Sequence, residues 1–170
     1  MRFFRPDPPP DARPRYPLVS SGWCSALVLL AALIGAGDAI DERRAVAWAV
    51  ERIGSGPILI ASSSTPEEVA ALQSRHGRDA AGHAIEQAMA DIAEGLVQSG
   101  VRRLVVAGGE TSGAVVDRLR IPGFLVGAEI AAGVPVLSAV GADKGEMLLA
   151  LKSGNFGGTE FFSDALKLMR

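Results

Sequence analysis

The 170-residue sequence is poor in several residue types, and each shortage excludes a class of protein. A single cysteine, Cys24, rules out an internal disulfide and a zinc site built from cysteines. Its two histidines, His76 and His83, lie in polar helical sequence, so we expect both on the surface and predict no metal bound by protein ligands. Lysine and arginine (17) nearly balance aspartate and glutamate (19), and their mixing argues against a nucleic-acid partner.

Long apolar runs are also missing, although hydrophobic residues make up 48% of the chain. The run at residues 26–34 is much shorter than the roughly 20 residues that cross a bilayer, so we predict no membrane partner. We interpret it as a buried core helix that Gly35 and Gly37 close. The alternative is the hydrophobic part of a signal peptide, for which the preceding proline-rich and acid-containing sequence is poorly suited.

The first residues differ in composition from the rest, being rich in proline and arginine. We predict that residues 1–20 form a disordered arm and that residues 21–170 form one domain.

Beyond residue 40, short apolar runs alternate with amphipathic segments, which is typical of an α/β fold. We expect a loop at 129–135 and a helix start at 62–68. The order of elements fits a three-layer fold in which a mostly parallel sheet is flanked by helices. We predict strands at 58–61, 104–106, 124–127, 136–140 and 147–152, and helices at 41–53, 79–99, 115–119 and from residue 159 or 163 onward.

A glycine turn directly follows the apolar strand at 104–106. Gly108 and Gly109 leave no side chain between the main chain and a ligand, and Thr111 or Ser112 is expected to cap the next helix. An exposed helix N-terminus attracts anions through its unpaired N–H groups and its dipole, and the adjacent carboxylate adds a hydrogen-bonding group. The alternative is a turn that binds nothing, because Gly-Gly is common between strands and helices. Neither P-loop nor dinucleotide-binding spacing is present.

A second polar turn, residues 152–158, follows the last predicted strand. Lys152, a serine and several glycines would place a cation, a hydroxyl and bare N–H groups together, which suits phosphate oxygens. The alternative is a lysine at the strand edge that points to solvent. Because ligands of open α/β sheets bind beyond the carboxyl ends of the strands, we predict that the two turns meet and hold the phosphates of a nucleotide.

Three stretches of the sequence, in this order, closely resemble one family: Ala107-Gly108-Gly109-Glu110-Thr111-Ser112-Gly113-Ala114-Val115, Val126–Pro135, and Leu149–Gly157 with Phe161-Phe162. The family is that of the four-carbon acid-sugar kinases, which includes 3-oxo-tetronate kinases. The chain is similar to its C-terminal nucleotide-binding domain from about Pro57 onward. The resemblance implies a cytoplasmic kinase that uses ATP and Mg²⁺ to phosphorylate a sugar acid, which binds to an N-terminal domain.

The resemblance also assigns residues to the nucleotide. It implies contacts from Gly109, Glu110, Thr111, Ser112 and Gly154, to which the physical reasoning adds Gly108, Lys152 and Asn155. Ser25 matches a nucleotide-contacting serine of the family, although the family's Gly-Ser-Cys-Ser is Gly22-Trp23-Cys24-Ser25 here, and apolar residues replace the Thr and Gln that follow. No catalytic residue is assigned.

Family members are far longer, so we expect the sugar-acid substrate to bind a domain that is missing here. The chain would then bind ATP without turnover. Two alternatives stay open: a non-catalytic nucleotide- or phosphate-binding module, and an inactive remnant. The oligomeric state is also open, with a homo-oligomer among the alternatives.

Overall fold

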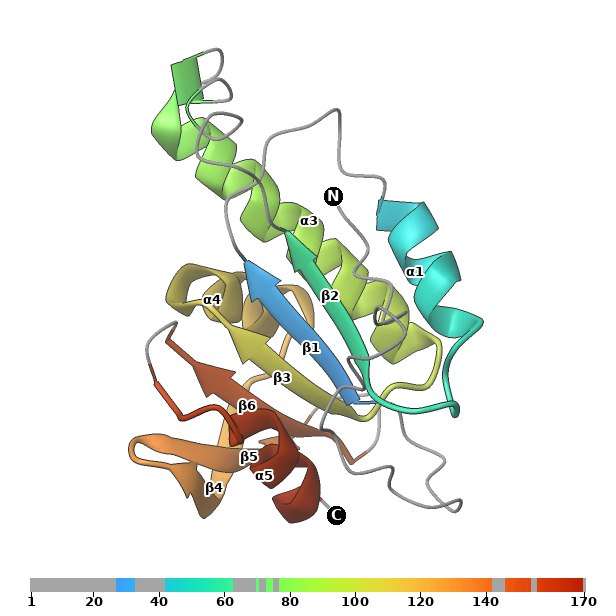
Figure 1. Cartoon of the computed structure of the whole chain (residues 1–170), viewed down its shortest axis with the longest axis vertical. Helices are drawn as coiled ribbons and strands as arrows, with labels where there is room; N and C mark the ends of the chain where they lie inside the picture. The colour runs from blue at the N-terminus through green and yellow to red at the C-terminus, as the bar shows by residue number, and fades with distance from the viewer. Residues whose placement is uncertain are drawn as a thin grey trace, which may run out of the picture.

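Figure 1 shows the computed structural model of the chain, which describes residues 27–32 (backbone only), 42–62, 70, 73–74, 77–141, 146–153 and 156–169. The predicted arm at 1–20, most of the predicted helix start at 62–68, and the site candidates Ser25, Gly154 and Asn155 lie outside these residues. The elements are β1 (Leu27–Ala32), α1 (Glu42–Val50), β2 (Ile58–Ser62), α3 (Arg78–Gln98), β3 (Arg103–Ala107), α4 (Gly109–Arg118), β4 (Gly123–Ala131), β5 (Val134–Val140), β6 (Leu148–Lys152) and α5 (Phe161–Leu168).

The strands form one six-stranded sheet in the order β2-β1-β3-β6-β5-β4. The first four strands of this order run parallel, and β5 and β4 complete the sheet as an antiparallel hairpin. Helix α3 joins β2 to the parallel β3, and α4 leads away from β3. The predicted α/β fold with a mostly parallel sheet is therefore confirmed.

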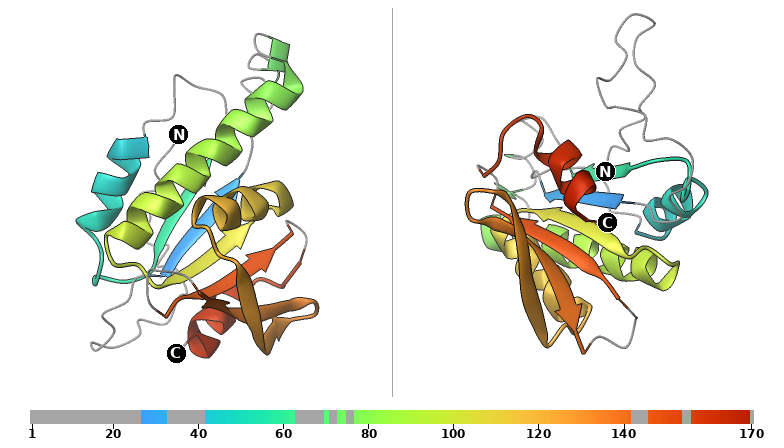
Figure 2. Two further views of the ribbon diagram at one scale, coloured as in Figure 1. Left: turned by 180° about the vertical axis from the view of Figure 1, so that it is seen from behind. Right: turned by 90° about the horizontal axis from the view of Figure 1, so that it is seen from below.

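Helices cover both faces of the sheet, which gives the predicted three layers (Figure 2). Helices α3 and α4 pack on one face, and α1 packs against α3. Helix α5 covers the other face, where Phe161 and Ala165 meet Val105 of β3 and Ala150 of β6. Strand β3 is buried on both faces, as its run of apolar residues predicts.

The prediction of a helix over residues 26–34 is wrong. Leu27–Ala32 is strand β1, which lies between β2 and β3 and pairs Leu29 with Leu59 and Val105. A short, continuous apolar run has no helical or alternating period, so periodicity alone cannot distinguish a buried strand from a buried helix. This segment is a strand because it pairs with a neighbouring strand on each side, β2 and β3.

The expected loop at 129–135 is also wrong, because β4 runs to Ala131 and β5 begins at Val134. The two strands are joined by a tight turn at Ala132 and Gly133, and Gly133 adopts a φ of 76° that favours glycine. The carboxylate of Glu129 accepts a hydrogen bond from the Gly133 N–H at 2.7 Å. This hairpin tip points toward the edge of the sheet where β6 ends, because β5 runs antiparallel to β6.

Helices α1 and α3 approach closely at Gly95, and this contact gives a stability prediction. A Cβ at Gly95 would lie 2.9 Å from Cγ2 of Val46. We expect Gly95→Ala to destabilise the chain by about 1 kcal/mol, because overpacking of roughly 1–3 kcal/mol outweighs the gain in helix propensity. In a Val46→Ala background the same change should stabilise by about 0.5–1 kcal/mol. Urea unfolding of the four proteins measures the coupling, and equal effects in both backgrounds would contradict the close contact.

Candidate functional site

The residues at which the two predicted turns begin, Gly108 and Lys152, lie side by side at the carboxyl edge of the parallel strands. Strands β3 and β6 are neighbours, and Ala107 pairs with Lys152 at their ends. Just beyond this pair, the Gly108 N–H donates a hydrogen bond to the Lys152 carbonyl at 2.8 Å. The start of the first turn therefore meets Lys152, the first residue of the second, whereas the contact of the two turns with a nucleotide stays a prediction.

Helix α4 begins directly at the glycine turn, before both the predicted caps, Thr111 or Ser112, and the predicted helix at 115–119. Gly108 is the N-cap, with a φ of 127°, and no side chain caps the helix through a hydrogen bond. The first helical bond, from Ser112 N–H to the Gly108 carbonyl, is 2.9 Å long, so the helix provides no acceptor for the N–H groups of residues 109–111. A Cβ built at Gly109 meets no atom of the described residues within 4 Å. The helix end is thus open above Gly109.

The prediction that Thr111 or Ser112 caps this helix is wrong. Because the helix begins at Gly109, both hydroxyls lie inside its first turns, and the two residues are only 2% and 8% exposed. The Ser112 Oγ atom is buried without a hydrogen-bond partner in the described part of the chain. A buried hydroxyl without a partner costs about 1–3 kcal/mol, so such groups are rare and are often completed by water or a ligand. This property fits a site whose hydrogen bonds are completed on binding.

Lys152 is a buried cation at the carboxyl end of an inner strand of the sheet. It is 8% exposed, and it ends β6, which lies between β3 and β5. Its Nζ atom lies 5.5 Å from the centre of the Phe161 ring, within range of a cation–π contact. The alternative of a strand-edge lysine pointing to solvent is therefore wrong, because β6 is not an edge strand.

A third segment reaches this edge of the sheet, and sequence reasoning missed its role. The tip of the β4–β5 hairpin lies against Phe156, whose Cε1 atom would be 3.4 Å from a Cβ at Gly133. Phe156 belongs to the glycine-rich turn after β6 and is 47% exposed. The available signal was a single aromatic residue within a polar, glycine-rich turn.

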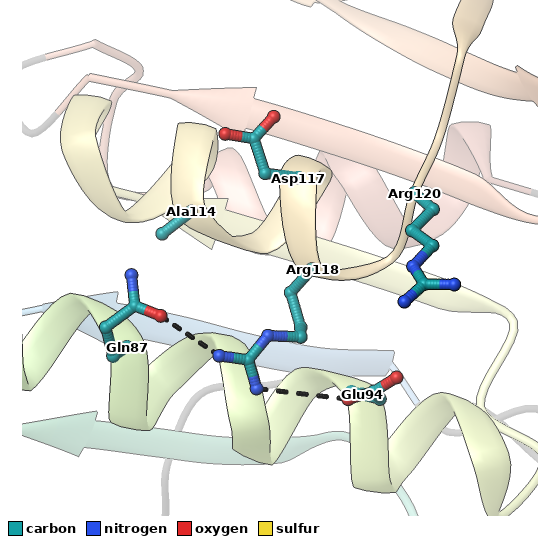
Figure 3. Close-up of a pocket in the computed structure, with 6 residues that line it drawn as sticks. All are labelled: Gln87, Glu94, Ala114, Asp117, Arg118 and Arg120. Carbon is teal, nitrogen blue, oxygen red and sulfur yellow. Dashed lines mark hydrogen bonds and ion pairs between the residues drawn. The ribbon is translucent and has the colours of Figure 1, made fainter.

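A cavity of about 370 Å³ lies between α3 and α4, toward the last turn of α4 (Figure 3). None of the predicted site residues lines it. Arg118 spans the space: its guanidinium donates to Gln87 at 3.0 Å, lies 3.9 Å from the Glu94 carboxylate and forms an ion pair with Asp91. The cavity is thus away from the glycine turn, and Arg118 links the two helices.

Two further properties concern metals and membranes. Among the residues that the structure describes, no three His, Cys, Asp or Glu side chains are grouped so that they could hold a metal ion. The helices within the described ranges include none that is both long and apolar enough to span a membrane.

Comparison with known proteins gives a consistent set of relatives. A family model described as "nucleotide-binding C-terminal domain" matches residues 24–162. A 3-oxo-tetronate kinase of Methylobacterium radiotolerans is 65% identical over 139 residues, which are 82% of this chain and 32% of that protein. A 3-oxo-tetronate kinase of Pseudomonas fluorescens is 51% identical over 133 residues, or 78% of this chain and 30% of that protein. The chain thus spans about a third of the length of these curated relatives.

Solved structures agree with the sequence relatives. The crystal structure of Haemophilus influenzae protein HI1011, of the family DUF1537, superposes with a TM-score of 0.70 at 31% identity. The match covers 86% of this chain and 40% of that one. The chain therefore belongs to the family of nucleotide-binding C-terminal domains, and the resemblance to the C-terminal domain of the four-carbon acid-sugar kinases is confirmed.

Proposed function

We propose that this chain is the ATP-binding part of a kinase that phosphorylates a four-carbon sugar acid such as 3-oxo-tetronate. The observation that carries the proposal is the hydrogen bond from Gly108 N–H to the Lys152 carbonyl, which joins the glycine turn to the end of β6 at the carboxyl edge of the sheet. Ligands of open α/β sheets bind at this edge. The relatives that are named 3-oxo-tetronate kinases supply the reaction class.

The residues at this edge suit the demands of phosphoryl transfer, in which the protein mainly positions groups and offsets charge. The N–H groups of Gly109, Glu110 and Thr111, for which the helix provides no acceptor, would donate to phosphate oxygens, with help from the dipole of α4. The Lys152 ammonium would offset the charge of the phosphates. The exposed Glu110 carboxylate would help to hold Mg²⁺ through the water ligands of the ion, which would supply positive charge to offset that of the phosphates.

Sugar-acid binding and activation of the acceptor hydroxyl are assigned to the part of the relatives that these 170 residues do not match. The matched part is about a third of each relative, and the base for the sugar hydroxyl belongs in this proposal to the remainder. We therefore expect ATP binding without turnover by this chain alone. A cytoplasmic location is part of the same proposal, because the nucleotide and the substrate are metabolites.

Stabilisation by Mg-ATP tests the nucleotide-binding half of the proposal. At 100 times its dissociation constant, a ligand that binds only the folded chain stabilises it by about 2.7 kcal/mol. We expect this increase in the free energy of unfolding with Mg-ATP and none with magnesium chloride alone, measured by urea unfolding. An unchanged unfolding curve at millimolar Mg-ATP would reject nucleotide binding and favour the inactive remnant.

Reconstitution separates a kinase part from a non-catalytic binding module. The N-terminal part of the Methylobacterium radiotolerans relative, added as a separate chain, should restore ADP release that depends on 3-oxo-tetronate. A module without a catalytic role would bind Mg-ATP and give no turnover with this addition. If the 170 residues alone released ADP in a reaction that depends on the sugar acid, sugar-acid binding would not need the unmatched part of the relatives, and this assignment would be wrong.

A further inference from the structure

The Phe156 ring is unusual for its position in the molecule. It is 47% exposed in a protein with few aromatic residues, and it follows the buried Lys152 by only four residues. The Phe156 N–H donates a hydrogen bond to the Ser153 carbonyl at 3.2 Å, which ties Phe156 to the residue directly after β6. A large apolar side chain therefore lies on the surface near the end of β6 and the candidate phosphate site.

The ring is supported from one side by the tip of the β4–β5 hairpin. Gly133 has no side chain and a φ of 76°, and a Cβ there would approach Phe156 to 3.4 Å at Cε1 and 3.8 Å at Cδ1. The ring therefore lies directly against the turn. The hairpin tip itself is apolar, because Ile130, Ala131 and Ala132 precede the glycine.

The order of strands in the sheet places Phe156 and the hairpin tip at a distance from the glycine turn that a nucleotide can span. In the strand order β3-β6-β5-β4, the glycine turn follows β3, and the tip of the β4–β5 hairpin lies two to three strands away. Adjacent strands lie about 4.8 Å apart, so the separation is roughly 10–15 Å. A ribose and its phosphates can span such a distance, with the base at the far end.

We infer that Phe156 is the platform on which the base of the bound nucleotide stacks, and that Gly133 supports the ring from behind. The inference rests on the proposed function and adds the position of the base to it. A base offers a flat π-face, and stacking on an aromatic side chain needs no specific hydrogen bonds. A ring that is already held in place by a backbone contact loses little conformational entropy when a ligand binds over it.

Binding of two ligands, Mg-ATP and magnesium tripolyphosphate, to the 170-residue chain tests the inference, because only the first carries a base. We expect Phe156→Ala to weaken Mg-ATP about tenfold and to leave tripolyphosphate unchanged, both measured by isothermal titration calorimetry. Phe156→Tyr keeps the ring and should retain Mg-ATP binding, whereas Phe156→Leu keeps an apolar side chain without a π-face and should behave like alanine. Leu168→Ala, at an exposed apolar residue of α5, is the matched control and should change neither ligand.

Each other outcome overturns the stacking platform in a recognisable way. Equal Mg-ATP binding by wild type and Phe156→Ala would show that the base lies elsewhere, with the proposed function intact. Equal weakening of both ligands would show that Phe156 only shapes the turn. Retained binding in Phe156→Leu would indicate a general apolar contact instead of stacking. Absence of binding of either ligand to the wild type would reject the proposed function, and this inference with it.

Discussion

Gly109→Leu is expected to weaken Mg-ATP binding about a hundredfold while the chain stays folded. A Cβ at Gly109 meets no atom of the described residues within 4 Å, so the folded protein has room for the side chain. The same room lies over the open N-terminus of α4, where the proposed phosphates would sit. A leucine there would displace one or two charge-assisted hydrogen bonds of about 1.5–3 kcal/mol each. Calorimetric titration with Mg-ATP measures the loss.

Gly113→Leu is the matched control for this substitution. Gly113 lies on the same helix, and a Cβ there also meets no described atom within 4 Å. It is four residues further along, or about 6 Å from Gly109 along the helix axis. Both changes replace a helical glycine and should raise stability slightly, by up to about 1 kcal/mol. Similar nucleotide affinity in the two variants would contradict a phosphate site above Gly109.

Lys152→Met is expected to weaken Mg-ATP binding by about tenfold to a hundredfold. The change removes one charge-assisted interaction with the phosphates, of about 1.5–3 kcal/mol, and keeps the long apolar stem. Stability should fall little, because a methionine sulfur can pack against the Phe161 ring in place of the ammonium, and a buried charge no longer needs compensation. Calorimetric titration and urea unfolding of the same samples measure both effects.

Lys167→Met is the control for loss of a positive charge. Lys167 lies on α5, is exposed and pairs with Asp164 at 2.8 Å. Its removal changes the net charge by the same amount and should leave Mg-ATP affinity unchanged, apart from a small screened effect. If Lys152→Met bound Mg-ATP like wild type, Lys152 would be a packing residue of β6 and not a phosphate ligand.

The turn after β3 was predictable because its signals are local. A run of β-branched residues followed by two glycines and short polar residues specifies a strand, a turn and a helix start without reference to the rest of the chain. The long helix α3 was predicted almost to its ends, since apolar residues recur along it at helical spacing and Gly100 follows it. The capping role given to Thr111 and Ser112 failed, because the helix begins at the glycine, which places both hydroxyls inside its first turns.

The errors in the predicted fold arose at segments whose secondary structure is determined by pairing with distant parts of the chain. Leu27–Ala32 is apolar throughout, and only its place between β2 and β3 makes it a strand. Residues 129–135 contain glycine and proline and predict a loop, whereas cross-strand pairing extends β4 and β5 into a hairpin. Phe156 shows the same limit, because its exposure and its contact with Gly133 depend on a hairpin more than 20 residues earlier in the chain.

The amino-acid sequence by itself determined the class of fold, the two glycine turns and the family, because these depend on neighbouring residues and on the order of motifs. The tertiary structure decided that Leu27–Ala32 is a strand, that Lys152 is buried, and that the β4–β5 hairpin brings Gly133 against Phe156. The physical reason is that strand order and register are set by hydrogen bonds between segments far apart in the chain. Such pairing leaves no mark in the local sequence of either partner.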